Sequence, residues 1–420
     1  MAESTTYAVT PRQGWQEIIG LVLVIYAGMN LNGILHYATG LEGFLSPLIL
    51  VLSLVTIMLC ASARLVSTAY AWFMFFLLAY GIGGLVPLIG DGEVDAERIV
   101  AFAGTVIYCT AMYFYIAQRG EDGVRSVLSA LQIIFFMNCI AVLNDRFIVN
   151  YFNIDRPEER ASGFFDNPNE AAGMALYYII LIASTAKKID LWTVIKFSVA
   201  LAALLLTFSK TGMLLFIGLT VIFLCVRRLY GVLAVAVFGA VALLPVIHFI
   251  VSVNPFDMTD EQVLRIEQVL DVFSGEVDNK TTTGRVELWK IGIDRISKTI
   301  PLGTGIGTYH RMDGSGYIDL EGNWLGVHNT FLMVLGESGL VPFLIFLGFL
   351  FVLIRAAFLG MAPVTMVGFV VVFISDMFVG HGVLTTRLHD LMMCIIMAAG
   401  LQPQTQRSAS RTSNEVMRPT

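Results

Sequence analysis

The sequence predicts an all-α polytopic membrane protein with about 12 transmembrane helices and one large helical loop outside the membrane. Hydrophobic residues make up 56% of the 420-residue chain and charged residues only 14%, against about 25% in a typical soluble protein. Long apolar stretches recur along the chain, and a soluble core could not bury so much apolar surface. The net charge of -6 offers no basic surface for nucleic acid.

A membrane-spanning helix requires about 20 mostly apolar residues. The stretches that approach this criterion are 17–37, 44–62, 66–88, 99–117, 126–144, 170–185, 191–207, 211–226, 231–252, 337–356, 361–379 and 388–402. The first carries Glu17 and lacks a small-residue cleavage site, so it is not read as a signal peptide. Residues 1–252 are therefore assigned to helices 1–9 and residues 328–402 to helices 10–12. Residues 253–327 form the large loop, and residues 403–420 form a tail.

The distribution of Lys and Arg predicts which loops face the cytoplasm. Basic residues recur in alternate loops and in the tail, at Arg64, Arg119, Arg125, Lys187, Lys188, Arg227, Arg228, Arg355, Arg407, Arg411 and Arg418. The intervening short loops are poorer in basic residues, and 90–98 is acidic. Both termini are therefore expected in the cytoplasm, which places 145–169 and 253–327 on the outer face. Loops of this length are more often functional than connecting, so the chemistry is expected outside.

The large loop contains two predicted amphipathic helices. Thr259-Asp-Glu-Gln262 has the pattern of a capping box, and apolar residues follow it at helical spacing. This pattern predicts a helix over 260–274. A second apolar stripe predicts a helix over 285–298.

Arg285 and His328 are the two candidate catalytic residues. Arg285 falls in the first turn of its predicted helix, where a cation is unfavourable unless an anion binds to the free N–H groups and the guanidinium together. A solvated surface arginine is the alternative. His328 opens the next apolar segment, and an unperturbed imidazole, with a pKa of about 6.5, can accept a proton at neutral pH. A structural histidine at the interface is the alternative there.

Lys210 and Arg160 are further candidates for binding an anion. Lys210 lies in Ser209-Lys-Thr-Gly212, at the outer boundary between two spans, where snorkelling to the membrane surface is the alternative. Arg160 begins a segment rich in turn-forming residues that ends at Asn169. This segment is read as mainly architectural, with Arg160 as a candidate anion contact.

No pattern indicates a metal or a cofactor. The five cysteines lie in apolar stretches without CxxC spacing. His381 and His389 are eight residues apart, which suits no simple metal site, and a role at a helix end is expected. The glycine-rich run 301–307 lacks the Walker lysine and is interpreted as a tight turn against the membrane surface.

Four motifs, in this order, resemble those of the O-antigen ligase and polymerase superfamily of membrane glycosyltransferases. The motifs are Gly163-Phe-Phe-Asp-Asn-Pro-Asn169, Ser209-Lys-Thr-Gly212, Gly284-Arg285 with Trp289 and Pro301-Leu-Gly-Thr-Gly-Ile-Gly307, and His328-Asn-Thr-Phe with Glu337 and Gly339. They cover about residues 160–345. The second motif of the family usually reads Ser-Arg-x-Gly. Lys210 keeps the charge of that arginine but loses its bidentate geometry toward phosphate.

The resemblance implies a GT-C-like, multi-pass glycosyltransferase in the bacterial inner membrane, with cytoplasmic termini, a periplasmic active site, and no metal or cofactor. The donor would be a glycan on undecaprenyl diphosphate. The resemblance further implies that Arg285, Lys210 and Arg160 bind the diphosphate, and that His328 acts as the general base beside the catalytic Arg285.

The acceptor remains open at this point. An O-antigen ligase would use a sugar of the lipid A core, in lipopolysaccharide biosynthesis, whereas a polymerase would use another growing glycan chain. A different class would be a lipid-glycan flippase or secondary transporter, which places ionisable groups near the membrane midplane. Charges within spans are few here, Lys196 and Asp376 being the main ones, and the polar residues concentrate in the outer loops. This distribution favours the enzyme.

Overall fold

The computed structural model describes residues 11–39, 45–89, 96–147, 160–165, 167–186, 188–226, 228–231, 249, 251–255, 258–274, 285–309, 326–380 and 386–401. Within these ranges every regular element is a helix, which confirms the all-α class. The first half contains α1 (Pro11–Gly28), α2 (Leu31–Thr39), α3 (Leu45–Cys60), α4 (Thr68–Leu85) and α5 (Ala96–Phe147). The second half contains α6 (Pro168–Thr185), α7 (Leu191–Leu206), α8 (Lys210–Val226), α10 (Asp260–Ser274), α11 (Arg285–Thr299), α12 (Thr330–Ser338), α13 (Leu340–Leu359), α14 (Pro363–Val379) and α15 (Arg387–Ala399).

Three of the described helices are long and apolar enough to cross a bilayer, namely Thr68–Ile89, Ala96–Asp145 and Leu340–Leu359. Shorter apolar helices of 10–17 residues are Gly14–Gly28, Leu45–Cys60, Leu191–Leu206, Lys210–Cys225 and Pro363–Val379. By length and composition, these helices are consistent with an all-α membrane protein. The number of 12 spans stays a prediction, because most of the expected span 231–252 lies outside the described residues.

The expected spans 99–117 and 126–144 both lie in α5, on either side of Gly120. Gly120 is not helical (φ 59°, ψ -132°), so α5 consists of two helices, as expected, that meet at a kink. Only glycine adopts such a conformation without steric cost. The kink therefore changes the direction of the chain without a connecting loop.

Two other expected spans are divided. The stretch 17–37 is broken after α1, where Asn30 has a φ of 48° and starts a second helix, α2. Asparagine tolerates this left-handed conformation better than most residues. The stretch 337–356 is divided at Gly339 (φ 88°), so that α12 ends at Ser338 and α13 starts at Leu340.

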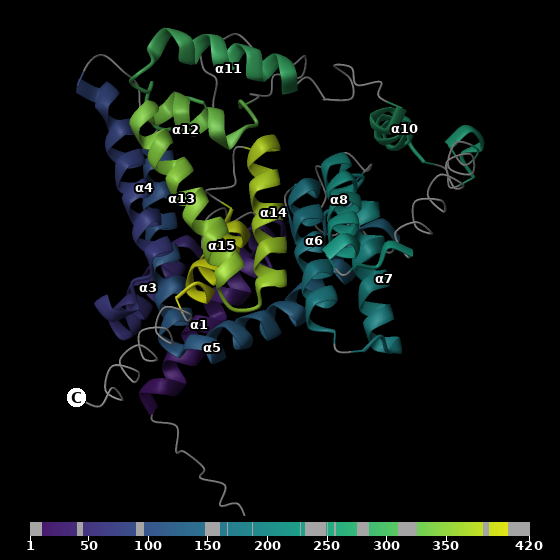
Figure 1. Cartoon of the computed structure of the whole chain (residues 1–420), viewed down its shortest axis with the longest axis horizontal. Coiled ribbons are helices and arrows are strands. Elements are labelled where there is room, and N and C mark those ends of the chain that lie inside the picture. The colour runs from purple at the N-terminus through teal and green to yellow at the C-terminus, as the bar shows by residue number, and fades with distance from the viewer. Residues whose placement is uncertain are drawn as a thin grey trace, which may run out of the picture.

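Helix α15 lies at the centre of the molecule. Its residues from Leu388 to Ala399 are all buried, and it packs against α5, α13 and α14. In Figure 1, α4, α12 and α13 stand on one side and α6, α7 and α8 on the other, with α14 and α15 between them. Helix α11 lies across the upper ends of this bundle (Figure 1).

The two helices predicted in the large loop are confirmed as α10 and α11. The capping box that predicts the start of α10 is formed in both directions. The backbone N–H of Gln262 donates to the Thr259 hydroxyl (3.3 Å), and the backbone N–H of Thr259 donates to the Gln262 side chain (3.2 Å). These bonds satisfy N–H groups that a helix otherwise leaves free.

Candidate functional site

A cavity of about 370 Å³ lies among the ends of α5, α6, α8, α11, α14 and α15. Its walls contain Arg285 and His328, the two residues predicted to be catalytic, which are 43 positions apart in the chain. Asn169 and Ser209, from two further motifs of the sequence, also line it. The fold thus brings residues from all four motif regions to one polar space.

Arg285 is the first residue of α11. Burial lowers the pKa of its guanidinium, and the nearby charge of Arg265 lowers it further. Both effects penalise a cation, so the position favours a bound anion that would compensate them. The N–H groups in the first turn of α11 have no partner within the helix and add to this preference.

His328 lies directly before α12, whose N-cap is Asn329. The Asn329 side chain accepts a hydrogen bond from the Leu332 backbone N–H (3.0 Å), which fixes the start of the helix and with it the position of His328. Burial, and then the charge of Arg285, lower the pKa of the imidazole to about 4. His328 is therefore neutral at pH 7 and has a nitrogen that can accept a proton.

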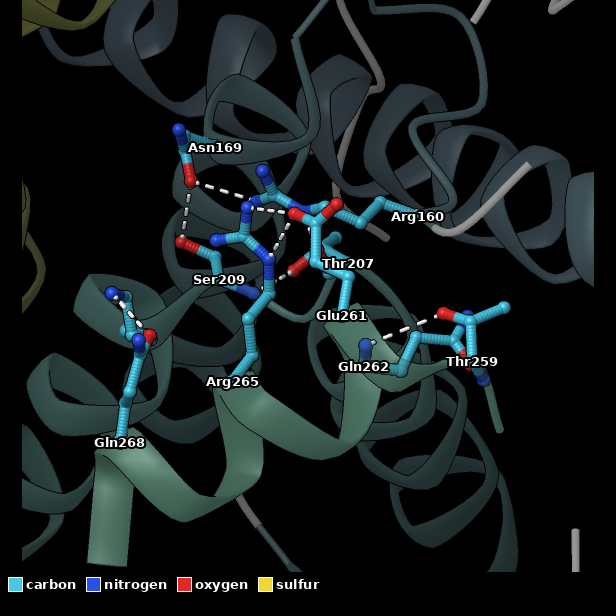
Figure 2. A network of polar contacts seen from close by, with 10 residues as sticks. Arg160, Asn169, Thr207, Ser209, Thr259, Glu261, Gln262, Arg265 and Gln268 are labelled. Carbon is cyan, nitrogen blue, oxygen red and sulfur yellow. Dashed lines mark hydrogen bonds and ion pairs between the residues drawn. The ribbon is translucent and has the colours of Figure 1, made fainter. Parts of the chain in front are cut away.

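Arg160 stands behind the cavity wall and supports it. Its Nε donates to the Thr207 carbonyl (2.8 Å) and its Nη2 donates to Oδ1 of Asn169 (2.9 Å). The Ser209 hydroxyl donates to the same Asn169 oxygen (2.9 Å), so this amide joins two of the predicted motifs (Figure 2). Burial, followed by the charge of Arg265, lowers the pKa of Arg160 to about 10. These contacts agree with an architectural role for the segment, and a direct contact with diphosphate stays a prediction.

Lys210 is the first residue of α8, and its ammonium donates to Oε1 of Gln268 on α10 (2.7 Å). Among the described residues, Ser209 and Thr211 line the cavity but Lys210 between them does not. Lys210 therefore lies at the edge of the cavity, in the contact between α8 and α10. Its predicted role on the diphosphate stays a prediction.

The cavity also contains an acid–imidazole pair that sequence reasoning missed. Asp376 of α14 and His389 of α15 both line it, with 3.5 Å between the Asp376 carboxylate and Nε2 of His389. The other ring nitrogen of His389 lies 3.0 Å from the Tyr177 hydroxyl. His389 was assigned to a helix end and Asp376 to a mid-span charge. An ionisable residue within an apolar stretch was the available signal, because such residues usually face a cavity or a partner.

Arg98 is the second guanidinium in the cavity wall, and it comes from the first turn of α5. Its sequence neighbourhood is the acidic outer segment 90–98, which gave no indication of a site. Nothing in the local pattern could have revealed Arg98, because its position depends on how α5 packs against the rest of the molecule.

The glycine-rich run is a tight turn, as the sequence predicts, but it packs against α12, whereas the membrane surface was expected. The Thr304 backbone N–H donates to the carbonyl oxygen of Gly336 (2.8 Å), and that of Gly305 donates to the carbonyl oxygen of Glu337 (3.0 Å). A Cβ atom at Gly303 would collide with the Glu337 carbonyl oxygen, so only glycine fits there. The buried Glu337 carboxylate also accepts hydrogen bonds from the Tyr80 hydroxyl and from the Tyr309 backbone N–H (3.1 Å). The run therefore serves packing.

In the part of the chain that the structure describes, no three His, Cys, Asp or Glu side chains converge as a metal-ligand set. The cavity combines guanidinium groups, neutral amide and hydroxyl groups, two imidazoles, and the carboxyl groups of Glu170 and Asp376. Such a lining can bind an anion, hold polar groups such as sugar hydroxyls, and accept a proton.

A family model described as O-antigen ligase matches residues 195–347. The matched segment contains Lys210, Arg285 and His328, while Arg160 lies before it. No curated protein matches the chain. The family match supports the superfamily assignment that the motifs indicated.

Proposed function

From its assignment to the O-antigen ligase and polymerase superfamily, we propose that this chain is a glycosyltransferase that moves a glycan from undecaprenyl diphosphate to a sugar hydroxyl. The reaction takes place on the periplasmic face of the bacterial inner membrane. The cavity shared by Arg285 and His328 is the observation that carries the proposal. We favour a ligase, whose acceptor is a sugar of the lipid A core. In a polymerase, the alternative, the acceptor is a growing glycan.

The transfer breaks the bond between the anomeric carbon and a diphosphate oxygen, and the electron pair leaves with the diphosphate. Negative charge therefore develops on the leaving group in the transition state. Arg285 and the N–H groups in the first turn of α11 are suited to stabilise this charge, since they form a fixed, partly buried cationic site. This electrostatic stabilisation takes the place of a divalent cation in the proposed reaction.

The acceptor hydroxyl forms the new bond to the anomeric carbon from the opposite face and gives its proton to His328. In the ligand-free cavity the charge of Arg285 helps keep this imidazole unprotonated. A bound diphosphate offsets that charge, which makes the imidazole a stronger base. Donor binding thus prepares His328 for its role.

Arg160 and Lys210 act around this centre in the proposed mechanism. Arg160 adds positive charge behind Asn169, at the position that its hydrogen bonds fix. Lys210 reaches the diphosphate by exchanging its hydrogen bond to Gln268 for one to a phosphate oxygen.

The proposal is tested with Arg285→Ala and His328→Ala variants, assayed with undecaprenyl-diphosphate glycan as donor and each acceptor in turn. Each change should lower the rate by about 10²- to 10⁴-fold, without abolishing membrane insertion. Lys290→Ala is the matched control, since Lys290 is an exposed residue of α11 away from the cavity. Release of undecaprenyl diphosphate distinguishes transfer from flipping. Wild-type rates in both cavity variants would exclude the assigned roles.

A further inference from the structure

His328 has a backbone conformation that few residues other than glycine adopt. Its φ is 46°, in the left-handed region, which costs free energy in a residue with a Cβ atom. Such a residue keeps this conformation only where the surrounding structure holds the backbone. The contacts of Val327 before it, and of Asn329 and Thr330 after it, therefore fix the position of the imidazole.

The chain after His328 is tied to the end of α14. The Asn329 side-chain amide donates to the carbonyl oxygen of Phe378 (3.3 Å), and the Thr330 hydroxyl donates to that of Gly380 (2.7 Å). Both Asn329 and Thr330 are buried. Because Gly380 lines the cavity, this side of His328 is fixed to the cavity wall itself.

The chain before His328 is tied to a buried carboxylate, that of Glu337, nine residues after the histidine. The Val327 backbone N–H donates to the Tyr309 carbonyl oxygen (3.2 Å). The Tyr309 backbone N–H donates in turn to Oε1 of Glu337 (3.1 Å), in the last turn of α12. Glu337 is 1% exposed, and Val327 and Tyr309 are fully buried. These two hydrogen bonds close a ring that follows α12 from His328 to Glu337 and returns through Tyr309.

Glycine at two positions lets neighbouring helices pack tightly against this ring. A Cβ atom at Gly336 of α12 would collide with the Tyr309 side chain, and one at Gly292 of α11 would lie 2.8 Å from Cγ2 of Val327. Helix α11, which begins at Arg285, thus packs against the residue directly before the catalytic imidazole. The ring therefore also relates the position of the imidazole to that of the guanidinium.

We propose that Glu337 is a positioning residue of the transferase, which holds Tyr309 and through it the backbone of His328. This inference rests on the proposed function for the role of His328 as the base. Among the described residues, Glu337 lies outside the cavity lining, so it acts through the backbone and not on the substrate. The Tyr309 N–H requires only an acceptor, so the hydrogen bond, and not the charge, is the essential feature of Glu337.

The Glu337→Met and Glu337→Gln variants separate the hydrogen bond from side-chain length. The Glu337→Gln side chain keeps an oxygen for the Tyr309 N–H and can donate to the Tyr80 hydroxyl, whereas the thioether of Glu337→Met is only a weak acceptor. With the undecaprenyl-diphosphate glycan as donor, Glu337→Met should lower kcat about 10- to 100-fold, because a small displacement of a catalytic group has a large effect on rate. Donor KM should change little, since Arg285 keeps its place on α11. Glu337→Gln should keep kcat near the wild-type value.

Two further variants control for damage to the fold. Tyr80→Phe removes the hydrogen bond at the other carboxylate oxygen but leaves the Tyr309 bond, so its kcat should stay near the wild-type value. Gly336→Ala displaces Tyr309 from the α12 side and should lower kcat as Glu337→Met does, which provides the test if Glu337→Met does not fold. The proposal is overturned if Glu337→Gln is as slow as Glu337→Met, or if neither Glu337→Met nor Gly336→Ala lowers kcat.

A measurement without any glycan keeps the two proposals apart. Diethyl pyrocarbonate acylates an unprotonated imidazole, and mass spectrometry of the His328 peptide gives the rate in the full-length protein in detergent. Glu337→Met should react about fivefold faster than the wild type, the factor by which the loss of one hydrogen bond favours local opening. Glu337→Gln should react like the wild type.

The two readouts together assign any failure. If Glu337→Met reacts faster with the reagent but the wild type transfers no glycan, Glu337 positions His328 and the transferase is wrong. If the wild type transfers glycan, and Glu337→Met matches it in both kcat and acylation rate, the transferase stands and the positioning role is wrong.

Discussion

At the residue scale, the proposed chemistry depends on a guanidinium placed beside an imidazole. The charge of Arg285 and the burial of the site both disfavour protonated His328. A base must be unprotonated to act, so this environment keeps His328 ready over a wider pH range than a free histidine. It also makes His328 a weaker base until an anion neutralises its neighbour.

The pH profile tests this arrangement. For the free enzyme, kcat/KM follows the protonation of the unliganded base, and the pKa of His328 is lowered to about 4. The acid limb of kcat/KM should therefore lie near pH 4, with little change between pH 5 and pH 7. The acid limb of the kcat profile should lie at higher pH than that of kcat/KM, because the bound diphosphate raises the pKa of the imidazole. An acid limb of kcat/KM near pH 6.5 would show that neither burial nor the charge of Arg285 lowers the pKa of His328.

Arg98 gives a second prediction at this scale. As the other guanidinium in the cavity wall, it should contribute to binding the diphosphate, so Arg98→Ala should lower kcat/KM for the donor by about tenfold or more. Glu97→Gln changes the neighbouring, exposed residue outside the lining and should have little effect. Equal kcat/KM values for Arg98→Ala and Glu97→Gln would show that Arg98 does not help to bind the diphosphate.

At the scale of elements, the contact between α10 and α8 decides the role of Lys210. The lysine ammonium and the Gln268 side chain join the two helices at the cavity edge. If Lys210 binds diphosphate, Gln268→Ala removes a competitor and should leave donor KM within about twofold of wild type, while Lys210→Ala should raise it about tenfold. If Lys210 only anchors α10, both variants should weaken the enzyme to a similar degree. Donor KM values for the two purified variants make the distinction.

Elements that depend on local signals were predicted well. The Thr259–Gln262 capping box placed the start of α10, and an apolar stripe placed α11. The two helices of α5 were predicted, but not that they meet at Gly120 without a connecting loop, because the polar residues between them resemble a loop. Arg285 and His328 could be selected from residue type and position. Asp376 and His389 carried only the general signal of an ionisable residue within an apolar stretch. Arg98 carried none, since tertiary packing alone brings it to the cavity.

At the scale of the whole molecule, the central helix α15 connects the cavity to the rest of the bundle. The Arg387 guanidinium donates to the Asp390 carboxylate on the same helix (2.9 Å) and to the Thr105 hydroxyl on α5 (2.7 Å). The Asp390 side chain is 1% exposed. Next to this pair, His389 lines the cavity. The polar centre of the bundle thus supports the floor of the site.

Breaking this pair should destabilise the whole fold. Arg387→Ala leaves the Asp390 carboxylate buried without its cation, which should cost about 3 kcal/mol and lower Tm in detergent. Changing both residues to leucine should recover much of the loss, because no buried charge is then left uncompensated. Lys298→Ala breaks the exposed Lys298–Asp294 pair on α11 and should change stability by less than about 1 kcal/mol. If Arg387→Ala has the same Tm as Lys298→Ala, α15 is held in place by its apolar packing alone. The ion pair then has no part in supporting the site.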